Sequence, residues 1–339
     1  MDVFSLTRSL VDIESITGNE AAVGHFLFQK LTELGFVVEM IPVPFPPEIA
    51  PAGRERFNLY AHSGPGTPQV VFSTHMDTVP PFLPSSEDGE RIYGRGSCDA
   101  KGILAAQVGA ALRLRAAGIP IAMLYVVGEE RDSLGAMAAN QQPRGARFLI
   151  NGEPTENRLA IASKGSLRVE LTARGRMAHS AYPELGESAI DKLLTALDRL
   201  RHMPLPAHPE YGPATLNIGV IEGGRAPNVV PDFARAHLQY RLIGDSAQLR
   251  QNILEAVAGL AEASFVLEIP FVKLRTVEGL PRMMAAYTTD IPNLTHWGEP
   301  LLLGPGSIHT AHTDKEFVEK RSLLEAVDLY SDIARKLLA

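Results

Sequence analysis

IAMLYVVGEERDSLG, residues 121–135, joins an uninterrupted apolar run to two adjacent carboxylates. The apolar part, 121–127, has the length of a strand that is buried on both faces, as in a parallel sheet. Glu129 and Glu130 follow at its end, where buried carboxylates are costly unless they have a cation or a catalytic task. On extended backbone the two side chains would point in opposite directions. A solvated acidic loop is the alternative interpretation.

Helix and strand patterns alternate on both sides of this strand. Apolar residues at helical spacing predict helices over 2–14, 19–34, 100–117 and 322–338. Strand-like composition predicts further strands over 36–43, 58–62, 69–75, 146–150 and 301–306. The alternation predicts an α/β domain with a largely parallel sheet. The proline-rich stretch 42–51 is predicted to be a surface loop.

A different order of elements interrupts this domain. Residues 166–174 alternate apolar and polar, as a half-exposed strand does. Further elements follow, with helices over 186–203 and 246–262 and strands over 214–221, 234–243 and 264–270. This β-α-β-β-α-β order is the ferredoxin-like split βαβ arrangement. We therefore predict an inserted α+β domain over 165–273 within a first domain of residues 1–164 and 274–339, with a hinge at Lys164–Gly165.

Composition limits the compartment and the partners. The formal net charge is −7, which argues against nucleic acid because phosphate binding requires a basic face. Cys98 is the single cysteine, so no intramolecular disulfide can form and a reducing compartment fits. No stretch approaches the ~18 apolar residues of a membrane span, and the first residues lack a signal-peptide core. We expect a soluble, cytoplasmic protein without a membrane or nucleic-acid partner.

Polar motifs follow several predicted strands, at the edge where open α/β sheets bind ligands. They are THMDTVP (74–80) with His75 and Asp77, GRGSCDAKG (94–102) with Asp99, NGEPT (151–155) with Glu153, and GPGSIHTAHTDKEF (304–317) with His309 and His312. Residues two apart on a strand point the same way, so Asp77 could hydrogen-bond a metal-bound His75 ring. The alternatives are a buried His–acid pair and, for Asp99, a helix N-cap. With one histidine of the last motif, and with Glu130 added, these motifs offer two histidines and three carboxylates, Asp99, Glu130 and Glu153.

The ordered set H-x-D, GRG-x-x-D-x-KG, G-E-E, GEP and A-H resembles the dinuclear zinc amidohydrolases and metallopeptidases. That family includes acetylornithine deacetylase, succinyl-diaminopimelate desuccinylase, aminoacylase and the glutamate carboxypeptidases. The resemblance covers nearly the whole chain and implies a zinc-peptidase-like catalytic domain that binds two divalent ions, Zn²⁺ or else Co²⁺ or Mn²⁺. It implies five metal ligands: His75 and Glu153 on one ion, Glu130 and His312 on the other, and Asp99 as the bridge. It also implies that Asp77 orients His75 and that Glu129 is the general base.

The inserted domain carries part of the resemblance. His179, in GRMAHSAYP (175–183), matches a histidine that steadies the tetrahedral oxyanion, often in the partner subunit's site. Asn228, in EGGRAPNVVP (222–231), and Arg241, in LQYRL, match substrate-binding positions, the arginine facing a carboxylate. The alternative, non-functional interpretations are polar loops for His179 and Asn228 and a surface charge for Arg241. The resemblance implies a lid and a homodimer formed through residues ~165–273, whose exposed sheet edges would be covered by pairing.

The expected activity is hydrolysis of the amide bond of an N-acyl amino acid by a metal-activated water. A dipeptidase or carboxypeptidase of the same family is the first alternative, and a non-catalytic metal-binding paralogue is the second. The presence of both Glu129 and His179 argues against the paralogue. If the metal-site prediction is right, no two of the five ligands should lie more than ~10 Å apart, because two bridged ions cannot span that gap.

Overall fold

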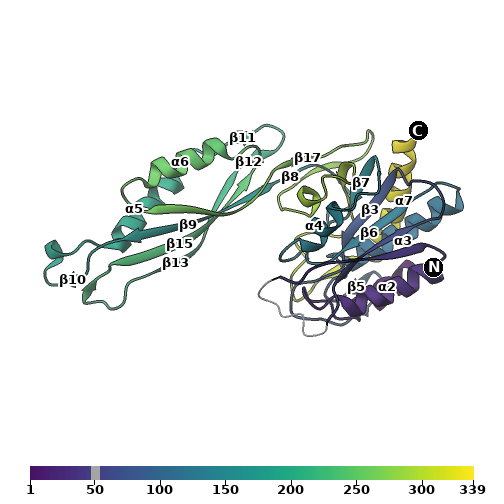
Figure 1. Ribbon diagram of the computed structural model, residues 1–339, viewed down its shortest axis with the longest axis horizontal. Coiled ribbons are helices and arrows are strands. Elements are labelled where there is room, and N and C mark those ends of the chain that lie inside the picture. The colour runs from purple at the N-terminus through teal and green to yellow at the C-terminus, as the bar shows by residue number, and fades with distance from the viewer. Residues whose placement is uncertain (47–53) are drawn as a thin grey trace. The chain divides into compact units, whose positions relative to one another are not determined.

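The chain folds into two compact units (Figure 1). The computed structural model describes residues 1–46 and 54–339, so the loop predicted at 42–51 lies partly outside the described residues. The first unit comprises Met1–Ile161, Leu274–Met283 and Thr289–Ala339. The second comprises Ala162–Lys273 and Met284–Thr288.

A six-stranded sheet forms the centre of the first unit, in the order β1-β2-β6-β3-β7-β19. Its strands are β1 (Val37–Pro42), β2 (Phe57–His62), β3 (Val70–His75), β6 (Ala122–Val126), β7 (Phe148–Asn151) and β19 (Glu299–Leu302). β6, β3, β7 and β19 run parallel to one another, while β1 and β2 pair antiparallel at one edge. Every residue of β3 and β6 is buried. The prediction of a largely parallel sheet around a buried strand at 121–127 is therefore confirmed.

Apolar side chains pack on both faces of this sheet. One face packs against α1 (Val3–Val11), α2 (Ala21–Glu33), α3 (Lys101–Ala116) and α7 (Lys320–Leu338). The other face packs against the short helix α4 (Leu134–Asn140) and the turn that carries Trp297. α3 is buried on nearly every side, which accounts for its small residues, since only these allow close approach of its neighbours. The helix α4 was not among the predicted elements.

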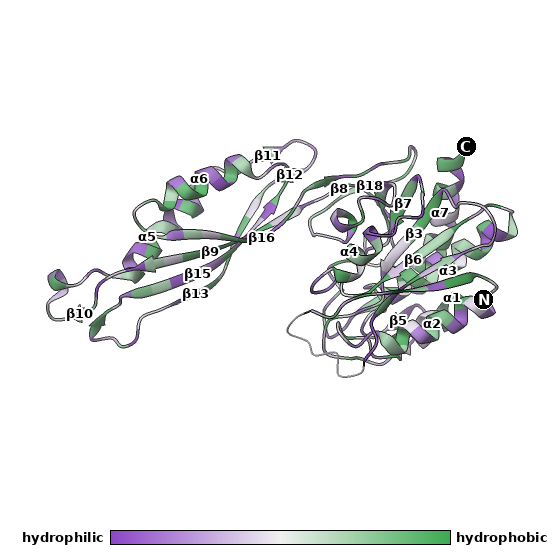
Figure 2. Cartoon of the chain, in the orientation of Figure 1, coloured by the Kyte–Doolittle hydropathy of each residue, from purple (hydrophilic) through white to green (hydrophobic). Residues whose placement is uncertain are grey.

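The second unit is an antiparallel sheet with two helices on one face. The strands β9 (Gly165–Arg174), β13 (Thr215–Gly223), β15 (Phe233–Leu242) and β16 (Glu262–Ile269) take the order β13-β15-β9-β16. Helices α5 (Ala189–His202) and α6 (Ala247–Val257) bury their apolar faces on β9 and β15 and leave hydrophilic residues outward (Figure 2). This is the predicted ferredoxin-like arrangement, with β13 and β16 as its edge strands.

Short elements complete the two units. In the first, β4 (Ser86–Glu87), β5 (Arg91–Tyr93) and β20 (Phe317–Glu319) form a small sheet, and η2 (Ile291–Asn293) is a 3₁₀ turn. In the second lie β10 (Ala178–His179), η1 (Pro183–Leu185), β11 (Ala207–His208), β12 (Gly212–Pro213) and β14 (Val229–Val230). A further three-stranded sheet joins β17 (Val272–Lys273), β8 (Leu159–Ser163) and β18 (Arg282–Ala285).

The unit boundaries differ from the predicted ones at two places. Residues 162–164 and 284–288 cluster with the second unit, whereas the sequence assigned them to the first domain. Hydrogen bonds link these two segments: Ser163 Oγ donates to the carbonyl of Tyr287 (2.6 Å), and the Lys164 N–H donates to the carbonyl of Ala285 (2.9 Å). Residues 284–288 therefore belong to the second unit because they are hydrogen-bonded to Ser163 and Lys164. No local sequence pattern indicates this pairing.

Candidate metal centre

The five predicted metal ligands come together at one edge of the central sheet. His75 is the last residue of β3, Glu130 and Glu153 follow β6 and β7, Asp99 precedes α3, and His312 lies in the loop after β19. They form two groups, His75–Asp99–Glu153 and Asp99–Glu130–His312, and in each group the ligand atoms lie within 4.8 Å of one another. Parallel strands end at the same edge, so chain segments far apart in sequence deliver their side chains to one place.

Asp99 belongs to both groups. Its Oδ1 lies 3.0 Å from Nε2 of His75, and its Oδ2 lies 3.5 Å from Nε2 of His312. The same Nε2 of His312 is 2.9 Å from Oε1 of Glu130. The two carboxylate oxygens of Asp99 thus face different histidines, as expected of a carboxylate shared between two cations.

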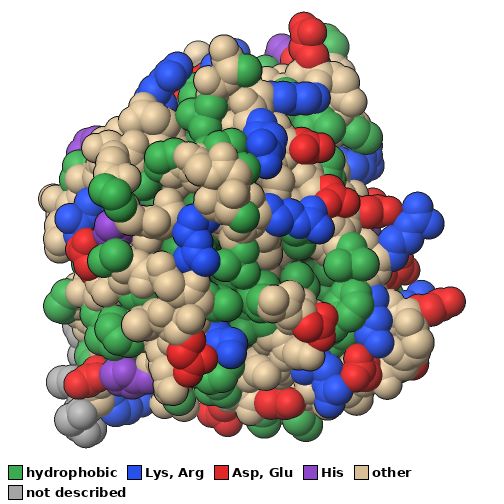
Figure 3. Space-filling model, turned by 90° about the vertical axis from the view of Figure 1, so that its right-hand side faces the viewer, with side chains coloured by type: hydrophobic (Ala, Val, Ile, Leu, Met, Phe, Trp, Pro, Cys, Tyr) green, Lys and Arg blue, Asp and Glu red, His purple; other side chains and the backbone are tan. Residues whose placement is uncertain are grey.

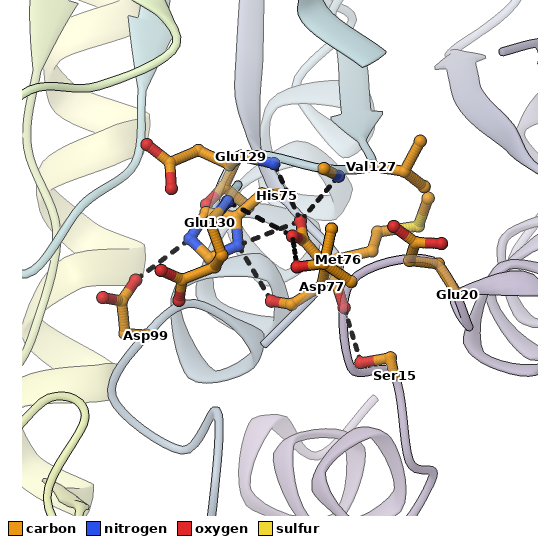
Figure 4. A network of polar contacts seen from close by, with 12 residues as sticks. Ser15, Glu20, His75, Met76, Asp77, Asp99, Val127, Glu129 and Glu130 are labelled. Carbon is orange, nitrogen blue, oxygen red and sulfur yellow. Dashed lines mark hydrogen bonds and ion pairs between the residues drawn. The ribbon is translucent and has the colours of Figure 1, made fainter. Parts of the chain in front are cut away.

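Asp77 holds the loop that carries the two glutamates (Figure 4). Its carboxylate accepts hydrogen bonds from the backbone N–H groups of Gly128 (2.9 Å), Glu129 (3.1 Å) and Glu130 (3.2 Å). Toward the His75 ring, the nearer atom is the main-chain oxygen of Asp77, 2.9 Å from Nδ1, and the carboxylate oxygen lies 3.6 Å away. Asp77 therefore contacts His75 as predicted, but its carboxylate serves chiefly as an anchor for residues 128–130.

The backbone after β6 turns rather than continuing as the extended segment that the sequence suggested. Residues 129–132 form turns, and Gly128 has φ 83°, where a Cβ would lie 2.3 Å from Nη2 of Arg56. Glu129 and Glu130 nevertheless point to different sides (Figure 4). Arg56 is fully buried and pairs with Glu20 (3.1 Å) and with Asp132 (3.2 Å) in the same loop. Asp77, through the backbone N–H groups, and Arg56, through Asp132, thus both hold this turn in place.

The electrostatics of the cluster fit a cation site. Burial raises the pKa of Glu129 and of Glu153 well above the usual range, and burial also raises the pKa of Glu130. Burial by itself would lower the pKa of His75, but hydrogen bonds with Asp77 and Asp99 raise it well above its ordinary value. Hydrogen bonds with Asp99 and Glu130 raise the pKa of His312 to about 10. Divalent cations would offset this crowding of buried carboxylates, and mixed nitrogen and oxygen donors suit zinc.

Known proteins share this sequence and fold. The sequence model of peptidase family M20/M25/M40 matches residues 71–336. The chain belongs to this family. It is 38% identical over 346 residues to a peptidase M20 domain-containing protein of Schizosaccharomyces pombe, with 97% of this chain and 83% of that protein covered. It is 40% identical over 368 residues to a probable carboxypeptidase of Aspergillus oryzae, with 96% and 85% covered.

Among solved structures, the aminopeptidase PepT from Bacillus cereus has a similar fold, with a TM-score of 0.81 at 23% identity, covering 99% of this chain and 98% of that one. M20 membership confirms the predicted family and makes the chain a hydrolase of the metallopeptidase class. Within the part of the chain that the structure describes, no helix has the length and apolar character needed to cross a membrane.

Two further buried carboxylates, Asp290 and Glu316, lie near the donor groups and were not predicted from the sequence. Asp290 is 1% exposed, and burial raises its pKa to about 7, although His75 and a hydrogen bond with Ser133 oppose this effect. Its charge also acts on Glu129. Glu316 is equally buried and contacts the Asp99 loop. Neither stands in a pattern that indicates burial. His309, the other histidine of the 304–317 motif, is exposed and belongs to neither donor group.

His179 and Asn228 lie together in the second unit. His179 on β10 pairs with Val229 on β14, and the N–H of Ser180 donates to the carbonyl of Asn228 (3.0 Å). The side chain of His179 is exposed, and its Nδ1 accepts a hydrogen bond from the N–H of Ala181 (3.1 Å). In the neutral ring the proton is therefore on Nε2, which is left as an outward donor.

Arg241 lies near the other end of the same sheet. It is the ninth residue of β15, which starts at Phe233, so at the rise of an extended strand it is ~26 Å from the end near β14. It is opposite Ser166 on β9 and shares a sheet face with Arg168, because residues two apart on a strand point the same way. Burial, and then Arg168, lower the pKa of its guanidinium. Arg241 has no carboxylate partner among the described residues, so its positive charge, close to that of Arg168, remains uncompensated.

Metal should stabilise this M20 peptidase more strongly at about pH 8 than at about pH 5.5. The raised pKa values of Glu130, Glu153, His75 and His312 mean that the metal-free fold retains protons there. Metal must displace these protons, so its affinity rises with pH for as long as they stay bound, which for His312 extends up to its folded pKa of about 10. The measurement is the melting-temperature difference between zinc-loaded and chelator-treated protein at each pH.

Taking this difference cancels groups that titrate alike in both forms, such as Lys101, whose pKa burial lowers to about 7. A difference that is constant or shrinks with rising pH would show that these residues do not hold the metal.

Proposed function

We propose that this M20 peptidase hydrolyses the amide bond that joins a C-terminal amino acid with a free α-carboxylate to the rest of a short peptide. The observation that carries the proposal is Asp99, whose two oxygens face separate groups of metal donors. The donor set favours two Zn²⁺ ions, with Co²⁺ or Mn²⁺ as alternatives. When bound, such ions make water more acidic and stabilise developing negative charge.

His75 and Glu153 would hold one ion, Glu130 and His312 the other, and Asp99 both. Glu129 belongs to neither donor group yet comes from the same loop as Glu130. A carboxylate with a raised pKa, next to the ligands but not among them, suits a general base. Glu129 would accept the proton of the attacking water and deliver it to the leaving amine.

Arg241 supports a substrate with a free carboxylate. Its partly buried guanidinium lies close to Lys164 and Arg168, and the described residues offer these charges no carboxylate. An anionic substrate group would compensate them through charge-assisted hydrogen bonds. Similarity to the probable carboxypeptidase of Aspergillus oryzae favours a carboxypeptidase. Deacylation of an N-acyl amino acid is the second candidate, because it cleaves the same amide beside the same carboxylate.

We further propose that His179 and Asn228 serve the partner subunit's site in a homodimer. The outward Nε2–H of His179 suits donation to an oxyanion. Two extended residues span only ~7 Å, so one dipeptide cannot contact both His179 and Arg241 of the same chain across ~26 Å of strand. The edge strands β13 and β16 leave Val220, Ile221 and Val266 exposed, which a second copy could cover.

The chain has one cysteine, which is buried and free. Since this fits a reducing compartment, we propose a cytoplasmic location. Acidic and basic side chains are mixed on the face drawn in Figure 3. Where the structure describes it, that face has no extended basic patch of the kind that binds nucleic acid.

Glu129→Gln should retain both metals but lose nearly all turnover, because an amide cannot accept the proton of water. Loss of a general base typically costs ~10²–10⁴-fold in kcat. The measurement combines steady-state kinetics with metal analysis of the purified variant. A variant with full metal content and near wild-type kcat would refute the role.

Arg241→Met should raise KM for substrates with a free C-terminal carboxylate. We expect about 10-fold or more, because a charge-assisted hydrogen bond contributes ~1.5–3 kcal/mol. The panel contains dipeptides, N-acetyl amino acids, C-terminal amides and N-blocked dipeptides. Arg235→Met is the matched control, since Arg235 lies on the same strand and sheet face but already pairs with Glu222 (2.7 Å).

Cleavage of C-terminal amides as fast as of free acids would contradict a carboxylate-dependent site. Loss of activity on every N-blocked substrate would instead indicate an aminopeptidase. N-acetyl amino acids cleaved in preference to dipeptides would favour the deacylase.

Mixing His179→Ala with Glu129→Gln subunits should restore activity if His179 acts in the partner's site. Each heterodimer then has one site with both residues intact, so at most half of the wild-type sites recover in heterodimers. Sedimentation should give twice the 36.7 kDa chain mass, and subunit exchange is checked with differently tagged chains. No recovery despite exchange would rule out donation between subunits.

A further inference from the structure

The segment that carries Asp99 has no regular secondary structure of its own. Residues 94–100 run as turns between β5 and α3, yet they are buried, so their backbone N–H groups require acceptors. One side chain supplies three of them. Oε1 of Glu316 accepts from the N–H groups of Gly96 (2.9 Å), Cys98 (3.1 Å) and Asp99 (3.0 Å).

The second oxygen of Glu316 is engaged by the same segment. Nη1 of Arg95 donates to Oε2 of Glu316 at 2.6 Å, and the two side chains are 2% and 0% exposed. The N–H of Gly94 donates to the main-chain carbonyl of Glu316 (3.1 Å). Glu316 therefore binds residues 94–99 through both carboxylate oxygens and its backbone, and Arg95 compensates its buried charge.

Glu316 stands four residues after His312 in the chain. Directly after it, β20 pairs with β5, with Phe317 opposite Tyr93. This pairing holds Phe317, the residue after Glu316, against β5, the strand that leads into residues 94–100. Two ligands of one donor group, Asp99 and His312, are thus connected by a short path through Glu316.

We propose that Glu316 is a positioning residue that holds Asp99 in register with His312 and so sets the geometry of the carboxylate shared by two metal ions. The inference rests on the proposed function. Glu316 belongs to neither donor group, and hydrogen bonds with the chain engage both of its oxygens. It acts through Asp99 rather than on the substrate. A purely structural role, in which Glu316 only stabilises the fold, is the alternative.

Two variants test this inference. Glu316→Gln keeps an acceptor for the three N–H groups but turns an NH₂ group toward Arg95. Glu316→Asp keeps the charge but is one methylene shorter, so it pulls the anchor away from the Asp99 segment. Trp297→Phe is the control, since it removes a buried hydrogen bond to Ala139 (3.0 Å) in the same unit without contact with a ligand loop.

The probes are Zn²⁺ and Co²⁺ added to metal-free protein, with affinity measured by chelator competition and the Co²⁺–Co²⁺ coupling by electron paramagnetic resonance. Both Glu316 variants should bind metal about 10–100-fold more weakly, as is typical when a residue behind a metal ligand is changed. The coupling should change, kcat should fall and KM should stay the same. Trp297→Phe should lower the melting temperature and leave the metal affinity unchanged.

Wild-type affinity and coupling in the Glu316 variants, together with a lowered melting temperature, would overturn the inference. If Glu316→Gln does not fold, Glu316→Asp alone decides by the same criteria, since it retains the ion pair. If neither folds, Glu316 has the structural role and the inference is wrong. Wild-type protein that binds neither ion would refute the proposed function itself, so the two failures are distinguishable.

Discussion

Buried carboxylates that accept backbone N–H groups are the constraint on which the metal centre depends. Asp77 binds three amides of the loop after β6, and Glu316 binds three amides of the segment before α3. Both segments are irregular, so neither a helix nor a strand ladder satisfies these donors. Charge-assisted hydrogen bonds to one acceptor take that place and fix the backbone more tightly than neutral ones would. The proposed ligands Glu130 and Asp99 are positioned as a result.

The fold brings the proposed ligands together with short connections. The buried carboxylates of the site, in turn, lower the stability of the fold. Parallel strands β3, β6 and β7 end at one edge, so short connections suffice to bring their side chains together. The cost is a set of buried carboxylates whose pKa values are raised, chiefly by their burial. Arg56 and Arg95 pair with other acids nearby, whereas Asp99 and Glu130 pair with the two histidines of the site. Strongly perturbed pKa values in such a cluster are typical of a functional site.

The second unit separates the residues proposed to bind substrate into two places. His179 and Asn228 are close neighbours across the β10–β14 pair, whereas Arg241 is near the far end of β15. An extended strand is stiff, so this separation is a property of the unit itself. A small substrate cannot bridge it, which is why the proposed function requires a second subunit if all three residues act on one molecule.

The sequence by itself determined the buried strand at 121–127, the alternation around it and the inserted ferredoxin-like unit, and its motifs pointed, through their resemblance to a known family, to the five residues that converge at the sheet edge. These follow from periodicity, which records which faces are buried, and from motifs whose residue types match a chemistry. Only the tertiary structure decided that residues 129–132 turn, that the carboxylate of Asp77 serves amides more than the His75 ring, and that residues 284–288 cluster with the second unit. It also decided the role of Glu316, whose partner Asp99 is 217 positions away. Local patterns report the burial and backbone geometry of neighbours in sequence, whereas a hydrogen bond across that distance depends on where the chain returns.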